Sequence, residues 1–434
     1  MTGLWRQARS FDTGVQLLLV NQLTINLGFY MLMPYLAAHL SGSLALSAWA
    51  VGLVLGVRNL SQQGMFLVGG ALADRLGYKP LIVAGCALRT VGFTALAFAD
   101  SLTTLIAASA ATGLAGALFN PAVRAYLASE AGERRVEAFA LFNVFYQTGI
   151  LLGPLLGLAL MSVSFPVTCL VSATLFAGLT VLQTRRLPER SGRPGGEPVR
   201  LRTQARTVLG NKPFWLFAAA MTGSYVLSFQ IYLALPLETQ RLTGEGPAAT
   251  IATSALFVVS GLVALLGQLR ITAWCKRTWS SPQCLVAGLL LMGAAFLPPL
   301  LSSFRPTAAG GSTADWSAAG WSAAALAVLP LLACAAGLAL ATAVLYPFEM
   351  DTLVVLARDR WVATHYGLYN TVCGIGITLG NLATGAVLDA SRAAGIAFAP
   401  WALLAAVGAA CAVAVAALAR GGHLRVPPKG AVAV

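Results

Sequence analysis

A short charged stretch, GGALADRLGYKP at 69–80, separates two apolar runs of the sequence. Asp74 falls at the C-terminal end of the helix that the first run predicts, where the helix dipole disfavours an anion. Its carboxylate therefore needs compensation from another segment. Gly70 permits close helix approach and Gly77 permits the chain to reverse, while the cations of the turn, Arg75 and Lys79, favour the side of the membrane on which basic residues accumulate.

Two arginines lie inside apolar runs. Arg58 is about 24 Å along a helix from Asp74, at 1.5 Å per residue. Gln62 follows Arg58 by four residues, one helical turn, and so lies on the same face. We expect Arg58 and Gln62 to form a polar stripe that faces a central cavity; the alternative is a structural pair with a backbone carbonyl. Arg89, nine residues into the third apolar run, is expected to have a structural role, with its guanidinium snorkelling to the membrane surface.

A titratable group at the middle of an apolar run would be a candidate for proton transfer. None of the fifteen acidic residues lies at the middle of an apolar run. The nearest candidates are Glu349, Asp351 and His365, whose imidazole can titrate near neutral pH. The alternative for the two acids is an ion pair at the membrane interface with one of three cations: Arg124, Arg358 or Arg360.

Several classes of function are excluded or made improbable by the motifs. None of the four lysines precedes Ser or Thr, so no P-loop is present. The seven cysteines are scattered without the spacing of a metal site. We therefore expect no enzyme, no cofactor and no metal. The net charge of +13 does not indicate nucleic-acid binding, because the cations lie in short loops between apolar runs.

The composition indicates an integral membrane protein, since 58% of residues are hydrophobic and only 10% are charged. Apolar runs of about twenty residues are long enough to cross a bilayer as helices. The sequence predicts an all-α membrane protein with twelve such spans, near 15–39, 47–73, 80–99, 102–127, 137–161, 164–184, 213–238, 250–272, 281–302, 321–346, 362–389 and 398–420.

The distribution of cations predicts the orientation. If the N-terminus is cytoplasmic, 23 of the 28 Lys and Arg residues are cytoplasmic and three are on the opposite side, which is a strong positive-inside signal. With an even number of spans, both termini are then cytoplasmic in the cell membrane. The Pro-, Gly- and Arg-rich segment 185–212 is expected to be a cytoplasmic linker between two six-helix bundles, 1–184 and 213–434.

The two bundles contain a weak internal repeat. FNVFYQTGILLGPLLG (142–157) matches YNTVCGIGITLGNLAT (369–384) at an offset of 227, which pairs Asn143 with Asn370, Gly149 with Gly376 and Gly153 with Gly380. These segments are the fifth spans of the two halves and run in the same direction. A parallel repeat predicts a pseudo-twofold axis along the membrane normal and a substrate site between the halves near the midplane.

Over essentially its whole length the sequence resembles the major facilitator superfamily, and the order of its motifs resembles the twelve-span drug:proton antiporter branch. Gly70-x3-Asp74-Arg75-x-Gly77-x-Lys79-Pro80 resembles the superfamily's loop motif between the second and third spans. The resemblance implies that Asp74 faces the N-terminus of the eleventh span, near Trp361 to His365, and locks the halves on the cytoplasmic side in one state. The alternative is a basic turn that serves topology only.

A second motif lies in the fifth span. Gly149-x3-Gly153-Pro154-x2-Gly157 resembles the motif associated with antiporters in this family. Glycines four apart make a smooth helix face for tight packing, and Pro154 removes a backbone donor. The resemblance implies an interdomain surface that seals the outer side, and generic helix packing is the alternative. This sequence departs from the family in the first span. Many drug antiporters have a membrane acid there, whereas this span reads LLLVNQLTIN and has none.

Amide and aromatic groups within spans suit an amphipathic organic substrate, and helix packing is the alternative for each of them. The candidates for the cavity are Asn26, Tyr30, Arg58, Gln62, Asn143, Gln147, Tyr225, Phe229, Gln230 and Asn370. The sequence thus predicts a monomeric secondary transporter that exports small amphipathic compounds such as antibiotics, with the proton as coupling ion. Two alternatives stay open. One is a transporter of a specific metabolite, for which Arg58 and the missing membrane acid favour an anion, and the other is a membrane sensor or scaffold that transports nothing.

Overall fold

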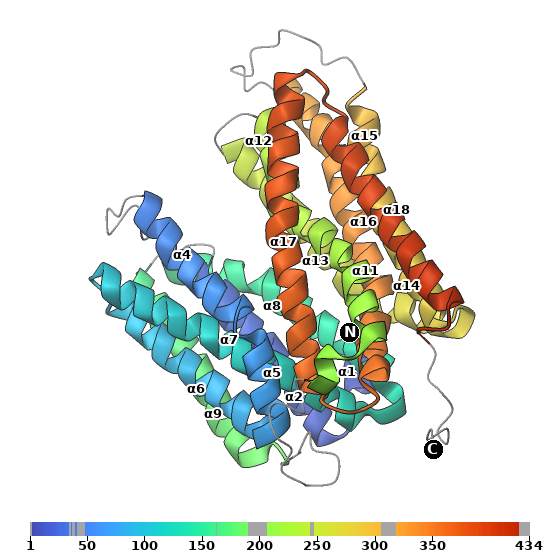
Figure 1. The fold of residues 1–434 in the computed structure, drawn as a ribbon. Coiled ribbons are helices and arrows are strands. Elements are labelled where there is room, and N and C mark those ends of the chain that lie inside the picture. The colour runs from blue at the N-terminus through green and yellow to red at the C-terminus, as the bar shows by residue number, and fades with distance from the viewer. Residues whose placement is uncertain are drawn as a thin grey trace. The chain divides into compact units, whose positions relative to one another are not determined.

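The computed structural model describes residues 2–33, 36, 40, 48–161, 163–189, 206–243, 247–304 and 318–424. Every regular element among these residues is a helix (Figure 1). The helices are α1 (Thr2–Arg9), α2 (Thr13–Tyr30), α4 (Ala48–Gln63), α5 (Phe66–Leu76), α6 (Tyr78–Ala97), α7 (Leu102–Ala131), η1 (Gly132–Arg134), α8 (Arg135–Met161), α9 (Phe165–Arg186), α11 (Lys212–Phe229), η2 (Gln230–Tyr232), α12 (Ala234–Thr243), α13 (Pro247–Thr278), α14 (Ser281–Ala294), α15 (Leu297–Ser302), α16 (Ala318–Ala357), α17 (Val362–Ala393) and α18 (Ala399–Arg420).

Among the described residues, nine helical stretches are long and apolar enough to cross a membrane. One of them, Leu102–Met161, covers both the fourth and the fifth predicted spans. The all-helical architecture agrees with the sequence, whereas the count of twelve spans stays a prediction. Of the expected linker, the central residues 190–205 lie outside the described part of the chain.

Helix boundaries follow local chemistry. α7 begins with a capping box in which the Thr104 N–H donates to Ser101 Oγ, and α14 begins with another in which the Ser280 N–H donates to Gln283 Oε1. α14 and α15 divide the ninth predicted span in two. Pro298 and Pro299 follow this break, and because they lack an N–H they cannot continue the α-helical ladder of the preceding turn.

The described chain forms two compact units. Unit 1 comprises Met1–Phe214 with Met350–Thr371, and unit 2 comprises Trp215–Glu349 with Val372–Val434. Their boundaries fall inside α16 and α17, so these units differ from the sequence halves at 1–184 and 213–434, which remain a prediction.

In unit 1, α6 packs between α7 and α9, α2 packs on α8, and α4 and α5 both pack on α7. The core of this bundle is aromatic: the Phe93 ring on α6 stacks on Phe176 of α9 with 5.3 Å between centroids. In unit 2, α14 and α15 pack on α18, and α12 packs on α13.

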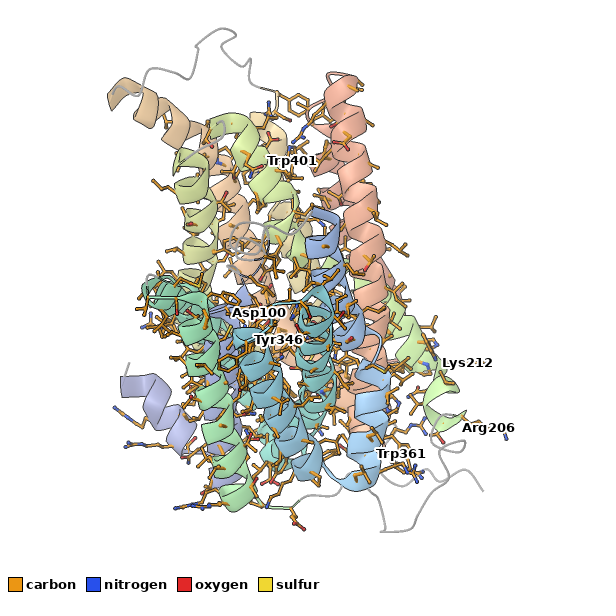
Figure 2. The ribbon with its side chains drawn as sticks, turned by 90° about the vertical axis from the view of Figure 1, so that its left-hand side faces the viewer. Asp100, Arg206, Lys212, Tyr346, Trp361 and Trp401 are labelled. Carbon is orange, nitrogen blue, oxygen red and sulfur yellow. The ribbon has the colours of Figure 1, made fainter. Side chains whose placement is uncertain are left out.

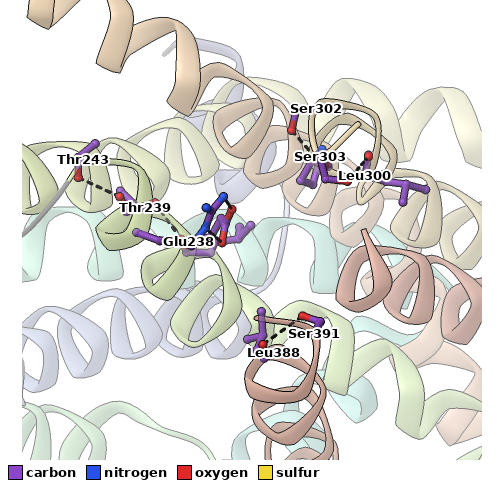
Figure 3. A network of polar contacts seen from close by, with 11 residues as sticks. Glu238, Thr239, Thr243, Leu300, Ser302, Ser303, Leu388 and Ser391 are labelled. Carbon is purple, nitrogen blue, oxygen red and sulfur yellow. Dashed lines mark hydrogen bonds and ion pairs between the residues drawn. The ribbon is translucent and has the colours of Figure 1, made fainter. Parts of the chain in front are cut away.

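Polar side chains at helix ends of unit 2 are satisfied locally (Figure 3). The Thr243 hydroxyl donates to the Thr239 carbonyl at 2.8 Å, and the Ser391 hydroxyl donates to the Leu388 carbonyl at 3.1 Å. Arg241 and Glu238 form an ion pair one helical turn apart. These bonds satisfy the hydroxyl donors within their own helices.

Candidate functional site

The carboxylate of Asp74, at the end of α5, lies against the first turn of α17. Asp74 is fully buried. Its Oδ1 accepts a hydrogen bond from the Ala363 N–H at 3.2 Å, and its Oδ2 accepts from the Thr364 N–H at 2.7 Å and from the Thr364 hydroxyl at 2.5 Å. We call Asp74 together with Ala363 and Thr364 the Asp74 cap.

The cap resolves the problem that the sequence poses for Asp74. The first N–H groups of a helix have no partner within it and carry the positive end of the helix dipole. The residue before α17 is Trp361, whose side chain has no oxygen to cap them. The dipole of its own helix α5 therefore destabilises the Asp74 carboxylate, whereas the N-terminal end of α17 stabilises it, because an anion is favoured there.

Close backbone approach between α5 and α17 allows these bonds. A Cβ added to Gly70 would lie 2.2 Å from the Ala363 carbonyl oxygen, and a Cβ added to Gly367 would lie 2.4 Å from the Phe66 carbonyl oxygen. Neither position can hold a side chain without separating the helices, so the two glycines set the distance at which Asp74 reaches α17.

The turn after α5 is built on Gly77. Its φ of 97° is a conformation that side chains disfavour, and its N–H donates to the Ala73 carbonyl, closing the helix. Beyond it, the hydroxyl of buried Tyr78 lies 3.5 Å from Asp74 Oδ1. Arg75 and Lys79 of the same motif are half-exposed, so the motif divides into a buried acid and two solvent-facing cations.

The protonation of Asp74 reflects two opposed effects. Burial is the larger and raises the pKa of Asp74 to about 7, while the hydrogen bonds donated by Thr364 and Ala363 lower it in part. The cap therefore contains an acid whose charge changes near neutral pH.

His365 follows the cap on α17 and is buried. Its Nδ1 lies 2.8 Å from the Trp361 carbonyl oxygen and its Nε2 lies 3.3 Å from Asn211 Nδ2. A carbonyl can only accept, so Nδ1 carries the proton, and Nε2 accepts from the amide of Asn211. Both ring nitrogens of the neutral tautomer are thus satisfied, and Asn211 also donates to the Leu356 carbonyl at 2.9 Å. This geometry favours a structural role for His365.

The other proton-coupling candidates lie in the last turns of α16. Glu349 is buried. Asp351 Oδ1 accepts from Arg135 Nε at 2.8 Å, and Arg135 Nη1 reaches Asp359 at 3.0 Å. One cation paired with Asp351 is therefore Arg135 at the start of α8, a residue that the sequence did not single out. In the view of Figure 2, the side chains of Arg206 and Lys212 project outward from the helices.

The glycines of the fifth-span motif pack α8 on α2. A Cβ added to Gly149 would lie 2.6 Å from Asn26 Cβ, and one added to Gly153 would lie 2.6 Å from Tyr30 Cβ. Pro154 is inside α8 and Gly157 is buried. These contacts are internal to the first half of the sequence, and a role in sealing an interdomain surface stays a proposal.

The second half repeats this packing in unit 2. A Cβ added to Gly376 of α17 would lie 2.0 Å from Thr222 Cγ2 on α11, and one added to Gly380 would lie 2.4 Å from Val226 Cγ1. The two aligned glycine pairs, Gly149 with Gly153 and Gly376 with Gly380, therefore have the same structural role. Each pair allows the fifth span of its half to pack closely against the first span.

Arg58 and Gln62 on α4 are paired as the helical spacing suggests. Arg58 Nη2 donates to Gln62 Oε1 at 3.1 Å, and Nη1 donates to Asn59 Oδ1 at 2.8 Å. Arg58 also lies over the Phe29 ring, with Cζ 4.5 Å from its centroid. An arginine at the centre of a span costs about 2.5–3.5 kcal/mol on insertion scales.

Arg89 does not snorkel, which corrects the expectation from the sequence. Only 4% of Arg89 is exposed, and its Cζ lies 5.1–5.4 Å from the ring centroids of Phe29, Phe119 and Phe176. These rings come from α2, α7 and α9. Favourable cation–π contact explains why the guanidinium stays inside the bundle.

The remaining cavity candidates are distributed over both units. Asn26 donates to the Gln22 carbonyl and Asn370 to the Tyr366 carbonyl, each within its own helix. In unit 2, Gln230 Nε2 donates to the Val226 carbonyl and lies 3.3 Å from Asn381 Oδ1, while its Oε1 is buried without a partner. The other candidates are Tyr30, Asn143 and Gln147 in unit 1 and Tyr225 and Phe229 in unit 2.

Comparison with known families decides the class of protein. The model of the Major Facilitator Superfamily matches residues 18–380. The chain belongs to the Major Facilitator Superfamily. The resemblance read from the motifs is thereby confirmed, and the chain is a multi-pass membrane protein of a transporter family that acts on small molecules.

Individual superfamily members show how far the similarity extends. An uncharacterized MFS-type transporter of Mycobacterium tuberculosis (strain ATCC 25618 / H37Rv) is 52% identical over 384 residues, 88% of each chain. The multidrug resistance protein MdtH of Klebsiella pneumoniae (strain 342) is 29% identical over 403 residues, 93% of this chain and 92% of MdtH. The crystal structure of the human organic anion transporter MFSD10 (TETRAN) has the same fold, with a TM-score of 0.69 at 16% identity, and the match covers 93% of this chain and 98% of that one.

Proposed function

We propose that the protein is an efflux transporter, which exports small amphipathic organic compounds across the cell membrane by alternating access driven by the proton gradient. Similarity to MdtH along 93% of the chain supports efflux of more than one compound. The orientation with both termini in the cytoplasm, and action as a monomer, are part of the proposal.

The observation that carries alternating access is the Asp74 cap. A carboxylate that satisfies the first N–H groups of α17 ties a helix of the first six predicted spans to a helix of the last six. In the proposed cycle this contact forms when the cytoplasmic side is closed and breaks when it opens. Arg135 with Asp351 and Asp359 adds ion pairs at the same end of unit 1.

The proton step is proposed to involve the acids near this end rather than His365, whose ring nitrogens are both engaged. Asp74 is favoured over Asp351, since burial brings the pKa of Asp74 to about 7. Asp351 is half-buried and paired with Arg135.

Accumulation of a panel of antibiotics and dyes in cells with and without the gene tests the proposal. Expression should lower accumulation of at least one compound, and an uncoupler that collapses the proton gradient should restore it. Asp74→Asn should abolish the difference. No change for any compound, or a phenotype that survives Asp74→Asn and the uncoupler, would instead support a sensor or scaffold.

A further inference from the structure

Outside the Asp74 cap, unit 1 contains two arginines inside the helix bundle that form no ion pair with any described carboxylate. Arg58 on α4 and Arg89 on α6 lie over the same ring, Phe29, at 4.5 and 5.1 Å. Among the described residues, the acceptors of Arg58 are the amide oxygens of Asn59 and Gln62. Neutral amides stabilise a cation less than a carboxylate does.

Three N–H groups of this pair are buried without a hydrogen-bond partner: Arg58 Nε, Arg89 Nε and Arg89 Nη1. Arg89 is more than nine-tenths buried. Cation–π contact uses the flat face of a guanidinium and leaves its N–H groups, which lie in the plane, unsatisfied. Buried donors that lack a partner are rare in proteins and call for a physical explanation.

The Arg89 guanidinium and the Gln62 amide both lie close to a position without a side chain. A Cβ added to Gly116 of α7 would lie 3.0 Å from Arg89 Nη2 and 3.1 Å from Gln62 Cδ. Gln62 in turn accepts from Arg58. Arg58, Gln62 and Arg89 therefore form one connected cluster within unit 1, in which Arg58 is half-exposed and Arg89 lies deeper.

We propose that Arg58 and Arg89 bind the anionic group of the transported compound, so that the substrates are amphipathic organic acids or zwitterions with a carboxylate, sulfonate or phosphate. An oxyanion has several lone pairs and accepts from more than one guanidinium N–H, which supplies the missing acceptors and the missing negative charge together. This inference rests on the proposed transport function and specifies its substrate class. The absence of an acid from the middle of the expected spans agrees with it, because such a site is not built for cations.

Binding of three ligands with one aromatic body tests the charge preference. The purified protein in phosphatidylcholine nanodiscs is equilibrated with radiolabelled 2-naphthoate, neutral 2-naphthamide or cationic 2-naphthylmethylamine. Wild type should bind 2-naphthoate about tenfold more tightly than the other two, the ratio expected for one charge-assisted hydrogen bond. No preference for 2-naphthoate, or no binding of it, overturns the proposal.

Variants assign the preference to the two arginines. Arg58→Gln and Arg89→Gln should each weaken 2-naphthoate binding about tenfold while 2-naphthamide binding changes less than about twofold. Arg58→Lys keeps the charge and should lose less than Arg58→Gln. The matched control is Arg134→Gln, since Arg134 also lies over a ring, Phe11 at 3.9 Å, but is paired with Glu137; it should behave as wild type.

Two results contradict the assignment: 2-naphthoate affinity unchanged in both glutamine variants, or an equal loss for all three ligands, which indicates a structural role. Should Arg89→Gln fail to fold, half-exposed Arg58 decides the question alone. If phosphatidylglycerol added to the nanodiscs competes with 2-naphthoate, the two arginines still form an anion site, but its ligand is a lipid phosphate.

Proteoliposome transport separates this inference from the proposed function. Binding of 2-naphthoate that depends on both arginines, without transport under any ion gradient, would refute transport and leave the anion site standing. Proton-driven transport that ignores substrate charge and both substitutions would refute the anion site and leave the transporter standing.

Discussion

Asp74 accepts two hydrogen bonds from Thr364, one from the backbone N–H at 2.7 Å and one from the hydroxyl at 2.5 Å. The two residues are 290 positions apart in the sequence. The contact makes the first turn of α17 depend on a side chain of α5, and several measurable consequences follow from that dependence.

Asp74→Ala should expose the N-terminus of α17. The substitution removes every side-chain acceptor for the N–H groups of Ala363 and Thr364, and a buried donor left without a partner costs about 1–3 kcal/mol. Deuterium exchange at these two amides should accelerate about tenfold or more. The control is Asp12→Ala, because Asp12 precedes α2 but makes no side-chain capping bond. Unchanged exchange in Asp74→Ala would show that the cap contributes nothing to the stability of α17.

Thr364→Val separates the hydroxyl bond from the backbone bonds. Valine keeps the β-branched shape and the backbone N–H but removes one donor to Asp74 Oδ2. We expect a loss of about 1 kcal/mol, smaller than that of Asp74→Ala. In the double variant the Thr364 substitution should have almost no further effect on exchange, since its acceptor is already gone. Fully additive effects would contradict a direct bond.

The cap should weaken as the pH rises. The pKa of Asp74 is about 7 in the cap, against about 3.9 for an aspartate in water. The capped form therefore holds a proton more readily than a form with Asp74 exposed. Its additional stability is fully present below about pH 4 and is lost as the pH rises through about 7.

Exchange at the amides of Ala363 and Thr364 measures this dependence once corrected for the intrinsic effect of pH on exchange. Protection should fall between about pH 4 and about pH 7 in wild type and level off at higher pH. Asp74→Asn cannot ionise, so its protection should be independent of pH over the same interval. An equal slope in both proteins would assign the titration to another group.

Arg135 should couple energetically to Asp351 and not to Asp359. The Asp351 side chain is 19% exposed and the Asp359 side chain is 73% exposed, although both lie within 3.0 Å of Arg135. Water screens the second pair far more, and exposed pairs contribute about 0–1 kcal/mol. Double-variant cycles with Arg135→Gln and each Asp→Asn, followed by thermal unfolding, should give about 1 kcal/mol for Asp351 and close to zero for Asp359. Equal coupling to both would contradict this.

The sequence predicted those features that depend on local pattern. Apolar runs predicted the helices, because a spanning segment must satisfy its backbone internally. The spacing of Arg58 and Gln62 predicted that they share one helix face, and there they form a hydrogen bond. The motif resemblance also pointed Asp74 toward the start of α17.

Features that depend on distant segments were not predictable from one sequence. Arg89 was expected to snorkel because nothing in its own helix shows that Phe29, Phe119 and Phe176 surround it. Arg135, which pairs with Asp351, was not among the expected partners for the same reason: it is 216 positions away. The second predicted span is divided into α4 and α5, and this break was not predicted because no proline lies between the two helices.

Packing in the fifth-span motif gives the last prediction, because the structure contains a matched pair of helical glycines. A Cβ at Gly149 would lie 2.7 Å from the Leu23 carbonyl oxygen and 2.6 Å from Asn26 Cβ, whereas a Cβ at Gly178 of α9 would meet nothing within 4 Å. Gly149→Ala must therefore push α8 away from α2, at a cost of about 1–3 kcal/mol.

Gly178→Ala should leave stability unchanged or raise it by about 0.5–1 kcal/mol, because alanine restricts the unfolded chain more than glycine does. Gly376→Ala should also destabilise the protein but less than Gly149→Ala, since its Cβ would lie 2.0 Å from Thr222 Cγ2, the end of a side chain, and within 4 Å of no backbone atom of another helix. Thermal unfolding of the three purified variants decides the matter: if Gly149→Ala and Gly376→Ala were as stable as Gly178→Ala, the repeated glycine contacts would not hold the first and fifth spans of each half together.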